Sequence, residues 1–159
     1  MRRISWTVVA VTTAAVLASG TWIFGSDGQG DENARGPREC NAATIRGNYG
    51  IQLQGTAQLP SGVIESVIGV VLRHYDGAGN ITQVDNVKGS VTGIVRDRFG
   101  IGTYVVNADC TGVGTFSPRP GFVIEERIVI VDDGNEIHSM VLSPPERMIT
   151  GVHRRIHSR

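Results

Sequence analysis

The stretch "GVIESVIGVVLRHYDGAGNITQVDNVKG", residues 62–89, contains two alternating runs separated by a glycine-rich turn. In the first run, 62–76, the even-numbered positions from 64 to 72 are apolar apart from Ser66, whereas the odd-numbered positions include Glu65 and Arg73. A period of two with one mostly apolar face is typical of a half-buried β-strand. The pattern therefore predicts a strand whose even-numbered face lies toward the core.

Residues 76–80, "DGAGN", predict a tight turn because Gly77 and Gly79 can adopt positive φ, and 81–89 then forms the return strand of a hairpin. Similar runs follow along the chain. We expect strands over 44–55, 62–76, 81–89, 90–107 (two strands, or one bent at Gly100 or Gly102), 110–118, 121–132, 136–143 and 147–156. About eight sequential strands without an amphipathic helix predict an all-β fold, an antiparallel up-and-down barrel. A β-sandwich is the alternative.

The N-terminus has the layout of a targeting segment. Arg2 and Arg3 precede an uncharged run over 4–24, as in a secretory signal peptide. The run is also long enough to span a membrane, so an uncleaved anchor is the alternative for residues 1–25. Residues 26–39 have the composition of a flexible linker, and 40–157 form the predicted barrel domain. The protein is therefore expected to be secreted or periplasmic, in contact with a membrane only through an uncleaved N-terminal segment.

Export bears on the two cysteines, Cys40 and Cys110. In an exported chain an even number of cysteines favours a disulfide, and the sequence around each lacks the His or Lys that would activate a reactive thiol, the alternative reading. Closing a loop of about 70 residues stabilises the folded state by about 4 kcal/mol in the chain-entropy model. We predict a Cys40–Cys110 disulfide that ties the first strand to a turn.

Four segments carry a resemblance to a known group of proteins. They are Cys40, "IRGNYGIQLQG" (45–55), "VLRHYDGAGNITQVD" (71–85) and "GIGTYVVNADCTGVGTF" (100–116). Together they resemble a set of uncharacterised secreted bacterial proteins, which are similar in predicted architecture to the allene-oxide-cyclase-like, calycin-like barrel. Tyr75 stands where Phe is usual and Val113 where Thr is usual. The resemblance implies an eight-stranded barrel and carries over no catalytic residue, because the shared positions are mostly glycines and turn formers.

Three residues are weak candidates for catalysis, namely Glu126, His74 and Tyr104. Glu126 shares its strand face with Phe122 and Ile128, so it is a buried carboxylate with a raised pKa if that face lines the lumen, and an ordinary solvated residue if it does not. His74 ends the even-numbered face of 62–76. We expect no metal site, because the His153 and His157 spacing suits a helix and these residues lie in a predicted strand and tail.

These observations favour an exported barrel of no assigned activity that binds a small apolar ligand in its lumen and is not an enzyme. One alternative is an isomerase or cyclase acting on an oxidised lipid, with Glu126 and His74 or Tyr104 in the lumen. Another is a structural or interaction module with a filled barrel. Removing residues 1–25 leaves 13 of the 15 basic residues against 15 acidic ones, a balance that argues against nucleic acid as a partner. No phosphate loop or dinucleotide fingerprint is present, and no cofactor is expected.

Overall fold

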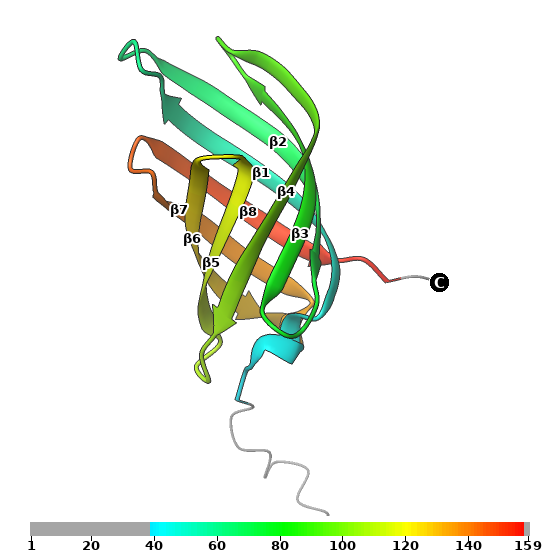
Figure 1. Ribbon diagram of the computed structural model, residues 1–159. Coiled ribbons are helices and arrows are strands. Elements are labelled where there is room, and N and C mark those ends of the chain that lie inside the picture. Colours follow the sequence, from blue (N-terminus) through cyan, green and yellow to red (C-terminus); the bar gives the residue numbers. More distant parts are fainter. Residues whose placement is uncertain (1–38, 158–159) are drawn as a thin grey trace, which may run out of the picture. The chain divides into compact units, whose positions relative to one another are not determined.

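The computed structural model describes residues 39–157, which form a closed barrel of eight antiparallel strands (Figure 1). The strands follow one another around the barrel in sequence order, and β8 pairs with β1 to close it. Their bounds are β1 Gly47–Gln58, β2 Ile64–Tyr75, β3 Asn80–Gly89, β4 Gly93–Val106, β5 Thr111–Arg119, β6 Phe122–Val131, β7 Glu136–Ser143 and β8 Arg147–Arg155. The predicted up-and-down barrel is confirmed, and 90–107 contributes one continuous strand.

Two short 3₁₀ helices accompany the strands, η1 (Ala42–Ile45) before β1 and η2 (Asp132–Gly134) between β6 and β7. The expected signal peptide or anchor, 1–25, and nearly all of the expected linker lie outside the described residues. Within 39–157, no helix is both long and apolar enough to cross a membrane.

Strand β2 faces the opposite way from the prediction. Its even-numbered residues Ile68, Val70 and Leu72 are 59%, 60% and 53% exposed, whereas Arg73 and Tyr75 are 2% and 0% exposed. Alternation along one strand shows which residues share a face, but it does not show which face is buried. In β2 the face that carries Arg73 is the buried one, because its polar groups find partners inside the barrel. The expectation that the even-numbered face of 62–76 lies toward the core is therefore wrong.

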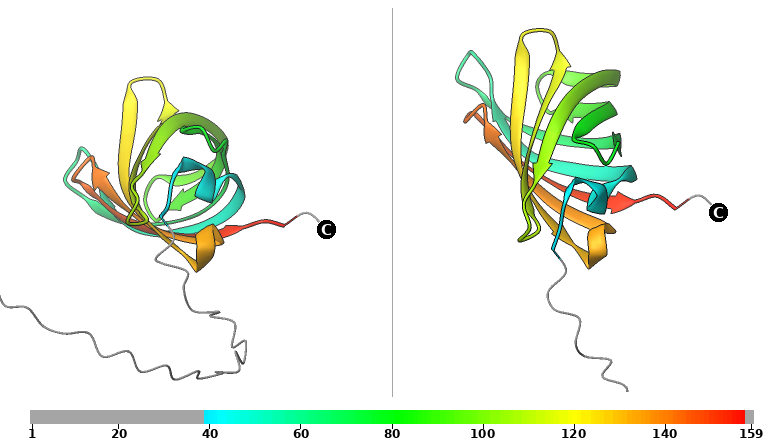
Figure 2. Two further views of the ribbon diagram at one scale, coloured as in Figure 1. Left: turned by 90° about the horizontal axis from the view of Figure 1, so that it is seen from below. Right: turned by 60° about the horizontal axis from the view of Figure 1, so that its bottom comes forward.

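One end of the barrel is closed by η1 and a tyrosine-rich core. Viewed from below, η1 lies across the opening of the ring of strands (Figure 2, left). The rings of Tyr49 and Tyr104 both meet that of Tyr75 edge-on, with centroids 5.4 and 5.0 Å apart. The buried cluster at this end comprises Ile45, Tyr49, Tyr75, Ile81, Tyr104, Ile128, Ile130 and Ile137. The other end, which carries the loops 59–63, 90–92, 120–121 and 144–146, has no such plug among the described residues.

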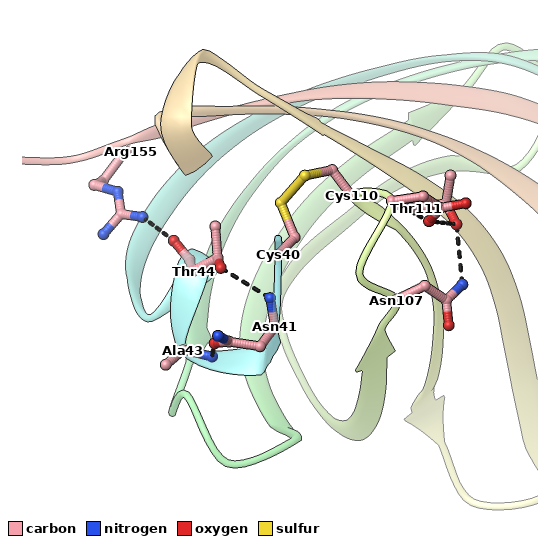
Figure 3. The surroundings of a disulfide bond; sticks show 9 residues. Cys40, Asn41, Ala43, Thr44, Asn107, Cys110, Thr111 and Arg155 are labelled. Atoms are coloured by element: carbon pink, nitrogen blue, oxygen red, sulfur yellow. Dashed lines mark hydrogen bonds between the residues drawn. A yellow bond between two sulfur atoms is a disulfide. The ribbon is translucent and has the colours of Figure 1, made fainter. Parts of the chain in front are cut away.

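Hydrogen bonds hold η1 in place. The Asn41 side chain accepts a bond from the backbone N–H of Ala43 at 2.9 Å, and Thr44 Oγ1 accepts one from the backbone N–H of Asn41 at 3.0 Å, which completes a capping box. Arg155, at the end of β8, donates to the carbonyl oxygen of Thr44 at 2.8 Å (Figure 3). The last strand thus fastens the plug to the barrel.

The disulfide between Cys40 and Cys110 is present, with a Cα–Cα distance of 4.9 Å. Cys110 has a φ of +64° in the turn between β4 and β5, and this turn is further held by the Asp109 carboxylate, which accepts from the backbone N–H of Thr111 at 3.0 Å. The bridge joins the chain just before η1 to that turn (Figure 3). Both cysteines pack against the tyrosine-rich core, so the disulfide secures the closed end of the barrel.

Replacing one partner of the disulfide tests its contribution. We expect Cys110→Ser to lower the free energy of unfolding by about 4 kcal/mol, because the unfolded chain gains the entropy of an open loop. At this size the melting temperature should fall by about 10 °C or more, measured by circular dichroism. Cys40→Ser should give the same loss, since either change opens the same bond. Equal melting temperatures for wild type and both variants would contradict the prediction.

Candidate binding site in the barrel lumen

A cavity of about 60 Å³ lies inside the barrel, between the tyrosine-rich core and the end opposite η1. All eight strands contribute to its walls. Strands β4 and β5 supply one residue each, Arg98 and Phe116. Three layers can be distinguished along the barrel: a polar floor, an aliphatic ring and a cationic mouth. Each layer follows from the period-two alternation of the strands that supply it.

The floor is a buried ion pair between Arg73 of β2 and Glu126 of β6, whose side chains are 3% and 5% exposed. Arg73 Nη1 donates to a carboxylate oxygen of Glu126. It also donates to the hydroxyl of Tyr75 at 3.1 Å, while its Nε donates to Gln83 Oε1 at 2.9 Å. Burial alone would lower the pKa of Arg73, but Glu126 and Tyr75 outweigh it and raise that pKa. The guanidinium therefore stays charged and fully engaged.

His153 of β8 extends this polar layer. The side chain is 1% exposed, and its two ring nitrogens lie 3.2 Å from the Tyr75 hydroxyl and 2.9 Å from Ser139 Oγ. Burial and the nearby positive charge of Arg73 lower the pKa of His153 well below its usual value. Burial also raises the pKa of Tyr75. Both side chains are therefore neutral near pH 7, and they link the ion pair to Ser139 by hydrogen bonds.

Above the floor the cavity wall is aliphatic. The side chains that form this ring are Leu53, Val67, Val71, Val87, Ile124, Val141 and Ile149. They come from β1, β2, β3, β6, β7 and β8, so the ring surrounds the cavity on most sides. This layer can hold a short hydrocarbon group and offers it no hydrogen-bonding partner.

Charged side chains of both signs lie at the mouth of the cavity, and not every cation there has a close acidic partner. Arg98 Nε and Nη2 donate to the two oxygens of Asp85 at 2.9 and 3.1 Å, and the Glu65 carboxylate accepts from the backbone N–H of Thr92 at 3.0 Å. Arg147 lies over the ring of Phe122 with its guanidinium carbon 4.9 Å from the centroid. Among the described residues no carboxylate lies within 4.0 Å of its side-chain nitrogens. Arg147 is therefore a cation at the mouth without an acidic partner within 4.0 Å among the described residues.

Two further arginines lie near Arg147. Partial burial and the positive charges of Arg98 and Arg119 lower the pKa of Arg147, while Glu65 acts in the opposite direction. Arg119 lies over the same Phe122 ring, 5.1 Å from its centroid. Like charges held together in a partly buried site favour the binding of an anion between them.

The three residues that the sequence singled out as catalytic candidates lie in three different places. Glu126 faces the lumen at the floor, as its strand parity allowed. Tyr104 is buried at the closed end, where its hydroxyl donates to the carbonyl oxygen of Ala42 at 2.9 Å and accepts from the N–H of Gly77 at 3.0 Å. His74 lies on the outside of β2, exposed and 2.8 Å from Asn48 Oδ1. The structure does not bring these three side chains together. The expectation that His74 lies in the lumen is wrong, because His74 is on the outer face of β2.

Sequence reasoning missed the partners of Glu126. Arg73, Gln83 and His153 belong to the same layer, and the register of the β2–β3 hairpin sets Arg73 opposite Gln83. The predicted turn at 76–80 would have given that pair, because it fixes which residues of the two strands are neighbours. Nothing local points from Arg73 to Glu126, which lies 53 residues further along the chain. Among the described residues, no three His, Cys, Asp or Glu side chains gather as they would to hold a metal ion.

Comparisons with known proteins leave the site to be interpreted on its own geometry. No protein-family model matches the chain, and no curated protein matches it. Among solved structures, the chain is similar to Rv2717c from M. tuberculosis, with 13% sequence identity and a TM-score of 0.36 over 72% of this chain and 94% of that one. The class of protein is defined by the strand pairing itself, which is that of a closed eight-stranded antiparallel β-barrel.

Neutralising Glu126 tests the ion pair at the floor. Glu126→Gln leaves Arg73 buried without a counter-charge, so we expect the free energy of unfolding to fall by about 3 kcal/mol or more in urea denaturation. The matched control is Glu125→Gln, because Glu125 is the neighbouring carboxylate on the opposite face of β6. The double variant Arg73→Met/Glu126→Leu should recover much of the loss. Equal effects of the Glu126 and Glu125 changes would contradict the prediction.

The low pKa of His153 predicts a pH dependence of stability. The unfolded chain takes up a proton at this residue below about pH 6.5 while the folded chain does not, so stability is complete above that pH and falls below it. The loss should be about 1 kcal/mol between pH 7 and 5.5, measured from urea midpoints. His153→Gln should remove this component, and His74→Gln, at an exposed site, should retain it. A pH dependence that is the same in all three proteins would rule out His153 as its source.

Proposed function

We propose that this protein is an exported barrel that binds a small organic acid in its lumen, with the hydrocarbon part in the aliphatic ring and the acidic group at Arg147. The observation that supports this proposal is an aliphatic cavity with a cation, Arg147, at its mouth and no carboxylate of the described residues within 4.0 Å of that cation. A buried or half-buried guanidinium recognises a carboxylate by charge-assisted hydrogen bonds. The floor is already satisfied internally, so recognition of the acid is assigned to the mouth.

The size of the cavity limits the ligand. Drug-sized ligands occupy pockets of about 300–1,000 Å³, whereas this cavity measures about 60 Å³. It accommodates a short chain of a few carbon atoms, or the end of a longer molecule that continues past the mouth into solvent. This supports a short-chain acid more than the oxidised lipid considered from the sequence.

Export is the second part of the proposal. The Cys40–Cys110 disulfide is typical of an oxidising, extracytoplasmic environment. The N-terminal signal layout, in residues outside the described part of the chain, points in the same direction.

Binding is favoured over catalysis because of how the polar groups of the lumen are occupied. Glu126 faces Arg73, and His153 is engaged through both ring nitrogens. A general base must reach the proton that it removes. Among the described residues two carboxylates line the cavity, Glu126 and Asp85, and each is held by a guanidinium. The arrangement supports a fixed polar floor for a ligand site and gives no support to an acid–base pair for isomerisation.

Titration with hexanoate, followed by amide chemical shifts and by native mass spectrometry, tests the proposal. We expect saturable binding of hexanoate, weaker binding of hexanol, and a loss of affinity for hexanoate of about tenfold or more in Arg147→Gln, since a hydrogen bond to a charged group contributes about 1.5–3 kcal/mol. Arg127→Gln is the matched control, because Arg127 is an exposed arginine on the outer face of β6. Hexanol binding as tightly as hexanoate would contradict the role of Arg147.

A second pair of variants locates the ligand. Ile124 points into the lumen and is 7% exposed, whereas its neighbour Val123 points outward and is 59% exposed. Ile124→Trp should fill the cavity and abolish binding, and Val123→Trp should leave it unchanged, with circular dichroism confirming that both remain folded. Failure of wild type to bind hexanoate or hexanol would favour the filled structural barrel instead.

A further inference from the structure

Because the apolar face of β2 points outward, the barrel carries a large exposed hydrophobic surface. Register places Leu72 opposite Val84, and Val84 opposite Phe99, in one row across β2, β3 and β4. These strands lie side by side in Figure 1. Three further apolar residues on the same face extend the row toward the open end of the barrel. The whole set, named here the β2–β4 face, comprises Ile68, Val70, Leu72, Val84, Ile94 and Phe99.

The exposure of this face is unusual for an isolated soluble domain. Five of its six side chains are between 53% and 62% exposed, and Val84 is 36% exposed. Single exposed apolar residues are ordinary, but contiguous apolar patches above a few hundred Å² mark interaction sites. Each side chain here presents on the order of 100 Å², so the β2–β4 face offers roughly 600 Å² of apolar area.

That area matches what a stable protein interface requires. A standard interface buries about 800 Å² per partner, of which about 56–65% is apolar. The β2–β4 face supplies this apolar share, and the polar side chains interleaved with it, Asn86 and Gln52 among them, supply a polar component. The Asn86 amide is already bonded to Asp97, donating to its carboxylate at 3.4 Å and accepting from its backbone N–H at 3.2 Å. The feature that suits a protein partner better than a bilayer is therefore the set of charged side chains on and beside the face, because lipid would bury charges without counter-charges.

The charges around the face identify that partner. Lys88 sits between Ile68 and Ile94 in the pairing register, and Arg96 and Asp97 are exposed on the adjoining segment of β4. A patch that carries both signs can pair with itself across a twofold axis, so that Asp97 of one copy meets Lys88 or Arg96 of the other. We infer that the β2–β4 face is the interface of a homodimer formed by two copies of this chain. Every strand edge is already paired within the closed barrel, so the contact is face to face.

This inference is independent of ligand binding and is tested on the exported protein by sedimentation equilibrium between 1 and 100 μM. We expect wild type to have the mass of two chains. Phe99→Lys and Ile68→Lys should each raise the dissociation constant by a hundredfold or more, because a charge is buried at the centre of the contact. The matched control is Val129→Lys, since Val129 is 44% exposed on the outer face of β6, away from β2–β4, and it should remain dimeric.

Three outcomes would overturn the homodimer. The first is a wild-type protein that is monomeric throughout the concentration range. The second is a dimer that persists in both Phe99→Lys and Ile68→Lys while circular dichroism shows an intact barrel, which would place the contact elsewhere. The third is a monomer that co-sediments with vesicles of anionic lipid and loses this property in Phe99→Lys, which would make the face a membrane contact.

Discussion

The orientation of the strands depends on the buried ion pair between Arg73 and Glu126. Both charges lie almost fully inside the barrel, and neither could be left there alone without a cost of several kcal/mol. Once Arg73 points inward to meet Glu126, the period-two geometry of β2 turns Val71 and Tyr75 inward as well and leaves Val70 and Leu72 outside. The polar floor of the lumen and the apolar outer surface are therefore two consequences of one pairing.

A second constraint makes the two ends of the barrel different. The Cys40–Cys110 disulfide and the hydrogen bonds of Arg155 hold η1 across one end, and the tyrosine rings fill the lumen behind it. No comparable plug is present at the other end of the described barrel, so the cavity lies there, above the ion pair. Under the proposed function, this asymmetry sets the end at which a ligand would enter and the end, around Arg147, at which its charged group would be bound.

Much of the fold could be predicted from local pattern. The turn at 76–80, the strand boundaries on either side and the single disulfide agree with the structure to within a few residues, because each depends on glycine, turn formers or cysteine number. The sequence predicted that Glu126 shares a face with Phe122 and Ile128 but left open whether that face lines the lumen, and the structure places it inside. Of the site, the sequence singled out only this one residue. Its partners were missed because the apolar face of 62–76 was taken as the inner one, which placed Arg73 outside.

The sequence by itself determined which residues are strands, where the chain turns and which side chains share a face, since these depend on alternation and turn chemistry within short segments. Alternation is unchanged when the two faces of a strand are exchanged, so it cannot say which of them is inside. Only the tertiary structure decided this, by bringing Arg73 to Glu126 across 53 residues of chain and closing β8 on β1. A charged side chain such as Arg73 can face the lumen only when an opposite charge also faces it, and here a strand distant in sequence supplies that charge.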